Sequence, residues 1–291
     1  MWGMSVAFLG PRGTNSEEAA LLYAGRDAEM IAFSSMPALT MAVETGLADV
    51  AILPIENSIE GPVSTTLDLL IYETGLKICA EIVVPIRPVL VTAEGATLEG
   101  ITSVLSHPQA LGQSRKFLER FLPNANQVAW LSTAGAVQEV ASSGDLTRAA
   151  IGPARAQELY GGQILARDIQ DIRSNLTRFV VLGSEDAPPS GDDKTLLGII
   201  VKQNIPGILA KVIEPFAHEG IQLTKLETRP VKGRLWEYVF LIDFEGHRTE
   251  PSVQRVLLAL EEPAAIMKIF GSFPRFPIES LTETVASPAM L

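Results

Sequence analysis

Short apolar runs alternate with amphipathic, alanine-rich segments along the chain as far as about residue 180. This alternation is typical of α/β folds, in which strands and helices follow one another in sequence. The apolar runs predict strands over residues 5–9, 49–54, 101–105, 149–152 and 179–182. The amphipathic segments predict helices over residues 17–23, 38–45, 108–121, 134–141 and 154–160.

A different pattern follows a polar stretch at residues 184–194, whose paired prolines cannot easily continue a helix or a central strand. Beyond this stretch, a helix is predicted to open at Pro206 and to stop at Gly220. Together with strands over 195–201, 221–228, 236–244 and 265–270 and a helix over 253–260, the order is βαββαβ, as in ferredoxin-like domains. We therefore predict a domain at 1–183, a linker at 184–194, a second domain at 195–277 and a tail at 278–291.

A weak internal similarity links Phe33-Ser34-Ser35 and the segment after it to Leu131-Ser132-Thr133 and its own following segment. Both stretches show a loop, a helix, a strand and a proline in the same order. The similarity favours two related lobes with a ligand cleft between them, because α/β proteins bind ligands at such places. Chance similarity of two ordinary αβ units is the alternative.

Composition restricts the classes of partner. A formal charge of -11 without a basic run argues against nucleic acid and anionic membranes as partners. No apolar run approaches the roughly 18 residues that a membrane-spanning helix needs. The N-terminus lacks a basic signal region, and the single Cys79 cannot form an intrachain disulfide. A cytoplasmic location is expected.

Four polar clusters each follow a predicted strand and are therefore expected to face one cleft; they occupy residues 10–16, 54–61, 106–109 and 131–133. Helices are predicted to begin at or near Ser16, Gly61, Pro108 and Thr133. Such helix starts bind carboxylate or phosphate through backbone N–H groups. The alternative for each cluster is simple helix capping.

The sequence predicts a reaction without a cofactor or a metal. The first turn, residues 10–14, matches neither common nucleotide-binding pattern, and the three histidines lie far apart without a neighbouring cysteine. His107 is a candidate general base, or it orients the loop ahead of Pro108.

The segment Asn175-Leu176-Thr177-Arg178-Phe179 resembles the Thr-Arg-Phe motif, preceded by asparagine, of prephenate dehydratases. Residues 10–18, 54–61 and 106–113 resemble other segments of that family, and residues 220–230 and 271–274 resemble its ACT regulatory domain. The resemblance implies a catalytic domain of two α/β lobes, similar to type II periplasmic binding proteins, followed by a ferredoxin-like ACT domain. It also implies decarboxylative dehydration of prephenate to phenylpyruvate in L-phenylalanine biosynthesis.

Family positions imply roles for particular residues. Thr177 matches the donor to the departing hydroxyl, and Asn57, Ser106 and Gln113 match residues that bind or orient substrate. Further candidates for substrate binding are Thr14, Ser58, His107, Thr133, Asn175, Arg178 and Phe179. For Arg178, support of its lobe through a buried ion pair is the alternative.

The ACT resemblance implies feedback control by L-phenylalanine and assembly into homodimers or homotetramers. The residues expected to hold the effector are Asn204, Pro206, Gly207, Ile208, Leu209, Glu227 and Thr228. Three residues depart from the family pattern: Ile208 stands where alanine is common, Thr228 replaces a serine, and Asn15 replaces a phenylalanine in the first catalytic motif. A domain that only assembles dimers is the alternative.

Two other functions remain open on the sequence alone. Arogenate differs from prephenate by an amino group in place of the keto oxygen, and no residue discriminates between them. A ligand-binding or sensor protein would use the same lobes without turnover, but it would not need the donor Thr177. No long helical stretch precedes residue 5, so a chorismate mutase segment is not expected.

Overall fold

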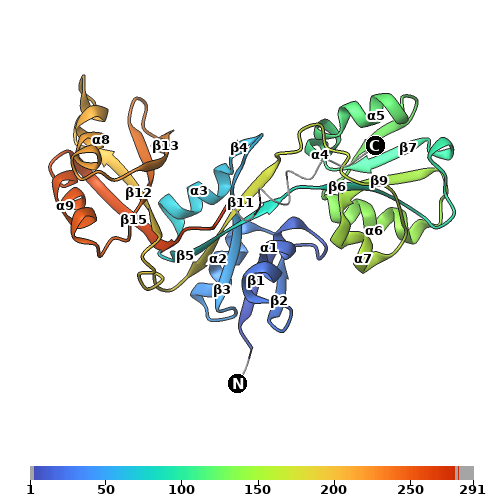
Figure 1. The fold of residues 1–291 in the computed structure, drawn as a ribbon, viewed down its shortest axis with the longest axis horizontal. Helices are drawn as coiled ribbons and strands as arrows, with labels where there is room; N and C mark the ends of the chain where they lie inside the picture. The colour runs from blue at the N-terminus through green and yellow to red at the C-terminus, as the bar shows by residue number, and fades with distance from the viewer. Residues whose placement is uncertain (1–2, 279–280, 282–291) are drawn as a thin grey trace. The chain divides into compact units, whose positions relative to one another are not determined.

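The computed structural model describes residues 3–278 and residue 281, and Figure 1 shows its ribbon. In this part of the chain two compact units are found. Unit 1 contains residues 3–64, 82–179, 277, 278 and 281, and unit 2 contains residues 65–81 and 180–276. Apart from Ile278 and Leu281, the predicted tail at 278–291 lies outside the described residues.

The first lobe of unit 1 is built on a sheet with the strand order β2-β1-β3-β11-β5, to which β4 adds beside β3. Its elements are β1 (Ser5–Leu9), α1 (Asn15–Ala24), β2 (Glu29–Phe33), α2 (Met36–Glu44), β3 (Val50–Asn57), β4 (Gly61–Pro62), β5 (Lys77–Pro85) and β11 (Leu176–Gly183). Residues 77–81 of β5 and 180–183 of β11 are part of unit 2. Strand β1 is parallel to β2 and β3, and Phe8 lies beside Ile52. Parallel strands point their carboxyl ends to one edge, where the polar loops gather.

The second lobe is built on a sheet with the order β10-β6-β9-β7-β8. Its elements are β6 (Pro88–Thr92), η2 (Leu98–Gly100), β7 (Ser103–Ser106), α4 (Pro108–Gln113), α5 (Arg115–Phe121), β8 (Asn126–Ala129), α6 (Thr133–Ser143), β9 (Arg148–Pro153), α7 (Ala154–Tyr160) and β10 (Gln163–Ala166). Strand β7 is parallel to β8 and β9, whereas β6 is antiparallel to β9 and β10.

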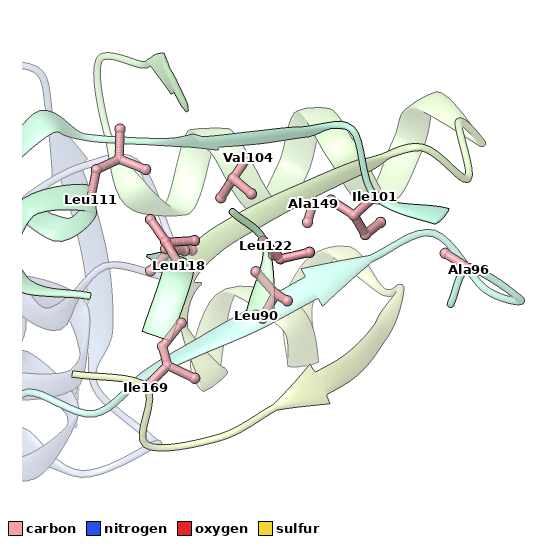
Figure 2. Close-up of a cluster of buried hydrophobic side chains, with 10 residues drawn as sticks. Leu90, Ala96, Ile101, Val104, Leu111, Leu118, Leu122, Ala149 and Ile169 are labelled. Atoms are coloured by element: carbon pink, nitrogen blue, oxygen red, sulfur yellow. The ribbon is translucent and has the colours of Figure 1, made fainter. Parts of the chain in front are cut away.

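Two hydrophobic clusters cover the two faces of this sheet. Helices α4 and α5 lie over one face and α6 and α7 over the other (Figure 1). On β9, Ala149 and Ile151 belong to the first cluster and Ala150 to the second, as the alternation of a pleated strand requires. Figure 2 shows the first cluster, in which Leu111 and Leu118 meet strand residues.

The predicted single helix at 108–121 is wrong, because the chain leaves helical geometry at Ser114. There φ is -114° and ψ is 18°, and α4 ends where α5 begins. The break lets Leu111 of α4 and Leu118 of α5 enter the same cluster. The hydrophobic period alone continues across the break, which explains the error.

Unit 2 contains the predicted βαββαβ order. Its elements are β12 (Asp193–Val201), α8 (Ile208–His218), β13 (Leu223–Pro230), β14 (Tyr238–Glu245), α9 (Pro251–Leu260) and β15 (Ala264–Pro274). The strands form an antiparallel sheet in the order β13-β14-β12-β15. Val212 and Phe216 of α8 and Val253 of α9 pack on it. This arrangement confirms the ferredoxin-like prediction.

Helix α8 begins later than predicted. Gly207 precedes it with φ of 82°, a left-handed conformation that glycine tolerates and a helix cannot contain. Pro206 therefore lies in the turn before the helix and not at its first position.

Unit 2 also includes a segment from the middle of the chain, where the π-helical turn η1 (Leu69–Glu73) follows α3 (Ser64–Asp68). Lys268 of β15 donates from Nζ to the carbonyl oxygens of Leu70 (2.6 Å) and Thr74 (2.8 Å) at the end of this turn. The turn thus lies against β15 on the side away from α8 and α9.

Candidate active site

A cavity of about 550 Å³ in unit 1 is lined by residues of both lobes. Seven predicted site residues line it: Thr14, Asn57, His107, Gln113, Thr133, Thr177 and Phe179. They come from strand ends and helix starts that are far apart in sequence. The structure therefore brings most of the predicted site together in one place.

The lining of this cavity carries no charged side chain apart from any charge on His107. Among the residues that the structure places there, none is Asp, Glu, Lys or Arg. Hydroxyl, amide and backbone groups supply its polarity. A bound anion would therefore depend on neutral donors and helix ends.

Asn57 at the end of β3 fixes the orientation of Thr177 on β11. Its Nδ2 donates to Thr177 Oγ1 (2.9 Å) and to Asn175 Oδ1 (2.8 Å), while Leu176 O lies farther away at 3.2 Å. Its Oδ1 accepts from the backbone N–H groups of Ile59 and Glu60, both at 3.0 Å. Since Thr177 Oγ1 accepts from Asn57, its own proton is available to a ligand in the cavity.

Gln113 at the end of α4 belongs to the same network. Its Oε1 accepts from Asn175 Nδ2 (2.9 Å), and its Nε2 donates to Glu60 Oε1 (3.1 Å). Asn175 is buried, so its amide needs these partners. The hydrogen bonds run from the first lobe to the second and back.

Two helices from different lobes begin at the cavity. Helix α1 starts at Asn15 with Thr14 as its cap, and Thr14 Oγ1 accepts from Glu17 N at 3.3 Å. Helix α6 starts at Thr133 with Ser132 as its cap. The first N–H groups of a helix have no partner within it, and the helix dipole adds positive potential there. Both ends suit a carboxylate.

The other two predicted helix starts do not act in this way. Residues Gly61 and Pro62 form strand β4, which pairs with β3, and the five-residue helix α3 begins only at Ser64. Helix α4 has six residues and opens with Pro108, which has no N–H to donate. The capping interpretation is thus the better one for the cluster at 106–109.

His107 caps α4 through its ring. Its Nδ1 accepts from Gln109 N at 3.3 Å, so in the neutral ring the proton lies on Nε2. The imidazole is exposed at the cavity and offers a donor there.

Four predicted site residues lie outside the lining. Ser106 is fully buried and donates to the carbonyl oxygen of Ile151 at 2.6 Å. Ser58 donates to Ser174 O and accepts from Leu176 N, which ties its turn to β11. Asn175 holds Asn57 and Gln113 as described above. Arg178 alternates along β11 with Thr177 and Phe179, so it belongs to the other face of the strand.

Sequence reasoning missed the lining residue Ser34, whereas Asn15 and Ser132 belong to the polar clusters that were predicted to face the cleft but were not singled out as substrate contacts. Ser34 follows β2, a strand that was not predicted. Its signal was nevertheless present, because Phe33-Ser34-Ser35 matches Leu131-Ser132-Thr133. Ser35 and Ser132 precede α2 and α6 as caps, and both matched loops contribute to the cavity.

The loop before α1 is held by a buried carboxylate. Glu17 accepts from the backbone N–H of Gly13 and forms an ion pair with Arg12 at 3.0 Å. Burial, with a contribution from Glu17, raises the pKa of Tyr160, whose hydroxyl donates to Arg12 O at 2.9 Å. A Cβ on Gly13 would lie 2.9 Å from Ala156 Cα, so the loop packs closely on α7 of the other lobe.

One of the predicted effector residues lines a cavity in unit 2. Asn204 lines a cavity of about 530 Å³ and donates to Trp236 O at 3.1 Å, whereas the other six lie outside its lining. Ile208 is buried and Leu209 is partly exposed on α8. On the edge strand β13, Glu227 forms an ion pair with Lys225 at 3.1 Å and Thr228 is exposed.

Within residues 3–278 and 281, no group of three or more His, Cys, Asp or Glu side chains is arranged to hold a metal ion. In the same part of the chain, no helix has the length and apolar character needed to cross a membrane.

Two α/β lobes with a shared polar cavity, followed by a βαββαβ domain, define a two-lobed ligand-binding or catalytic protein with an appended regulatory-type domain. Comparison with known families is more specific. The profile of the prephenate dehydratase family matches residues 6–187, and that of the ACT domain matches residues 195–262.

Individual proteins agree with the profiles. The bifunctional chorismate mutase/prephenate dehydratase of Neisseria gonorrhoeae is 42% identical over 93% of this chain and 74% of its own length. The prephenate dehydratase of Lactococcus lactis is 34% identical over 93% of this chain and 97% of its own. A crystal structure of prephenate dehydratase from Arthrobacter aurescens in complex with L-Phe superimposes with a TM-score of 0.86 at 34% identity, over 94% of this chain and 90% of that one. The chain belongs to the prephenate dehydratase family.

Proposed function

We propose that this protein converts prephenate to phenylpyruvate, carbon dioxide and water. The observation that carries the proposal is the Thr177 hydroxyl, which accepts from Asn57 and so keeps its proton for a ligand in the cavity. Membership of the family supports the same reaction.

The reaction balances with one proton and no redox partner. The bond from the ring to its carboxylate breaks, and the electron pair moves through the ring as carbon dioxide departs. The carbon–oxygen bond at the opposite ring position then breaks, the hydroxyl takes up a proton and leaves as water, and the ring becomes aromatic. Hydroxide is a poor leaving group, so a donor at this oxygen is the main catalytic requirement.

We assign that donor to Thr177. An alcohol is a weak acid, so Thr177 acts as a positioned donor that passes on a proton and not as an autonomous acid. Asn57 orients it directly, and Gln113 contacts the substrate while holding Asn175. Ser106 supports the end of β7 from behind the cavity through Ile151.

The two helix ends suit the two carboxylates of prephenate. Thr14 and Thr133 stand at the starts of α1 and α6, and Phe179 supplies an apolar surface for the ring. Of the lining residues, none bears a carboxylate that could pair with the ammonium group of arogenate. This favours prephenate as the substrate.

We further propose that residues 195–277 form a regulatory domain that binds L-phenylalanine and joins copies of the chain into a homodimer or homotetramer. The ACT profile and the L-Phe in the complex of the Arthrobacter enzyme support the effector. Residues 1–183 would then be the catalytic domain and 184–194 the linker; the family matches over residues 6–187 and 195–262 support a domain boundary in this region. Residues 204–209, 227 and 228 remain the proposed effector contacts.

The experiment that tests the function measures phenylpyruvate formation from prephenate by the purified protein, with arogenate assayed in parallel. L-Phenylalanine is added in a second series, with L-tyrosine as the matched control. We expect turnover of prephenate that changes with L-phenylalanine and not with L-tyrosine. Turnover of arogenate alone would contradict the substrate, and no turnover of either by folded protein would contradict the reaction.

A further inference from the structure

Glu60 is an exposed side chain outside the cavity lining, in the turn between β3 and β4. We propose that it is a positioning residue, which sets the direction of the hydrogen bonds that leave Thr177 able to donate to the substrate. The proposal rests on the proposed function and adds a residue that acts only through others.

The direction of the network follows from groups whose roles are fixed. An ionised Glu60 carboxylate can only accept, so Gln113 must present its Nε2 to it. Gln113 Oε1 then faces Asn175, and Asn175 must donate from Nδ2. Each side-chain amide has one donor end and one acceptor end. The orientation that Glu60 requires of Gln113 therefore determines the orientation of Asn175 as well.

The other end of the network is fixed by the backbone. The N–H groups of Ile59 and Glu60 can only donate, so Asn57 must turn its Oδ1 toward them. Its Nδ2 then donates to Asn175 Oδ1 and to Thr177 Oγ1. Both ends require the same direction, and Thr177 is an acceptor within the protein.

Glu60 is the only charged member of this network, and hydrogen bonds to charged groups are stronger than neutral ones. A neutral amide at position 60 can still present an oxygen to Gln113. It therefore permits the same orientation of the hydrogen bonds but favours it less strongly than a carboxylate does. An ammonium group can only donate, so it requires Gln113 to turn its oxygen outward. Gln113 and Asn175 would then bring two donors together, and the hydrogen bond by which Gln113 holds Asn175, the partner of Asn57, would be lost.

The test compares Glu60→Gln and Glu60→Lys with wild-type protein in steady-state assays of prephenate turnover. Glu60→Gln is expected to keep kcat within about threefold, because an acceptor remains available. Glu60→Lys is expected to lower kcat by about 10- to 100-fold, corresponding to the loss of one hydrogen bond with a charged partner. Its KM is expected not to rise, because an added positive charge does not repel a dianion.

Glu99→Lys is the matched control, since Glu99 is exposed in η2 and outside the cavity. It makes the same charge change and is expected to leave kcat unchanged. Thermal unfolding checks that each variant is folded. The activity of wild-type protein tests the proposed function by itself. A failure of the proposed function can therefore be distinguished from a failure of the proposed role of Glu60.

Three results would overturn the role of Glu60 in active wild-type protein. The first is a Glu60→Lys variant with unchanged kcat. The second is an equal fall in kcat for Glu60→Gln, which would indicate a need for negative charge and not for direction. The third is a rise in KM without a change in kcat, which would place Glu60 in substrate binding.

Discussion

The cavity of unit 1 and the interior of unit 2 use polar groups in opposite ways. The cavity is lined by neutral amides, hydroxyls and helix ends. Unit 2 instead buries an ammonium group, Lys194 on β12, between the carboxylates of Glu81 on β5 and Asp243 on β14, each 3.3 Å away. In unit 2 buried charges connect elements, whereas in the cavity neutral donors are left to a ligand.

This difference has a physical reason. A buried charge must be paired, and a paired charge has little left to offer a substrate. Neutral donors at helix ends can stay partly unsatisfied in an open cavity because water replaces the ligand. Lys268 illustrates the cost of burial in unit 2, since burial, with a contribution from Lys77, lowers its pKa.

The largest effect is expected from a substitution that removes the neutral hydroxyl donor, Thr177, from the cavity. Thr177→Val keeps the shape of the side chain and is expected to lower kcat by roughly 10²- to 10⁴-fold, the range for a positioned proton donor. Thr177→Ser is the matched control, because it retains a hydroxyl, and it is expected to stay within about tenfold of wild type. Near-normal turnover of folded Thr177→Val would remove Thr177 from the mechanism.

The next largest effect is expected from a substitution that removes the buried ion pairs of Lys194 in unit 2. Lys194→Met leaves Glu81 and Asp243 buried without this counter-ion, which is expected to lower the free energy of unfolding by about 3–5 kcal/mol. Urea unfolding measures the change. Lys211→Met, at an exposed position of α8, is the control and is expected to change the free energy of unfolding by less than about 0.5 kcal/mol. Equal free energies of unfolding for the two variants would contradict the structural role of Lys194 between Glu81 and Asp243.

Much of the structure of the cavity and of unit 2 could be predicted from the sequence, and the helix caps show why. Helix starts were predicted at or near Ser16 and Thr133. Helix α6 begins at Thr133 with Ser132 as its cap, and α1 begins one residue earlier than Ser16, at Asn15, with Thr14 as its cap. The βαββαβ order of unit 2 was also predictable, since its strands are long and its helices strongly amphipathic. Strand β1 and helix α7 have the predicted limits, 5–9 and 154–160.

Strands β2, β5, β6, β8 and β10 were not predicted, and their environments explain the failure. Strand β8 is exposed along its length, so no hydrophobic pattern marks it. Strands β5 and β6 are separated by only Ile86 and Arg87, so their apolar residues form one long run without helix periodicity. Such runs are ambiguous until tertiary contacts divide them.

The contact between Asn57 and Glu60 on one side and Gln113 and Asn175 on the other was beyond sequence reasoning. The hydrogen-bonded side chains of Asn57 and Asn175 are separated by 118 positions. Motifs select Asn57, Asn175 and Gln113 individually, but only the fold shows that they share hydrogen bonds. Glu60 carries no local signal, since an exposed carboxylate in a turn is ordinary.

A third prediction concerns backbone packing in unit 2. A Cβ on Gly271 of β15 would collide with the backbone of Ile78 on β5. Gly271→Ala is therefore expected to lower the free energy of unfolding by about 1–3 kcal/mol, as other overpacking substitutions do. Gly75→Ala is the control, because nothing lies within 4 Å of its added Cβ. If chemical denaturation finds both variants equally stable, β5 and β15 do not pack this closely.

The smallest effect is expected from removal of a surface charge in unit 1, that of Asp49, which belongs neither to the cavity nor to a buried ion pair. Hydrogen bonds from the backbone N–H and the hydroxyl of Ser5 (2.7 and 2.8 Å) lower the pKa of Asp49. A lowered carboxyl pKa stabilises the folded protein above the unfolded-state value of about 3.9, and the contribution is lost as the pH falls through the folded-state value.

Asp49→Asn is therefore expected to lower the free energy of unfolding at pH 7 by less than about 1 kcal/mol, since Asp49 is exposed and screened by water. The difference between the variant and wild type should shrink as the pH falls below about 3.9, because the carboxylate of the unfolded state is protonated there and that of the folded state only at lower pH. Urea unfolding at several pH values measures it. A difference independent of pH would show that the side chain contributes through shape and not charge.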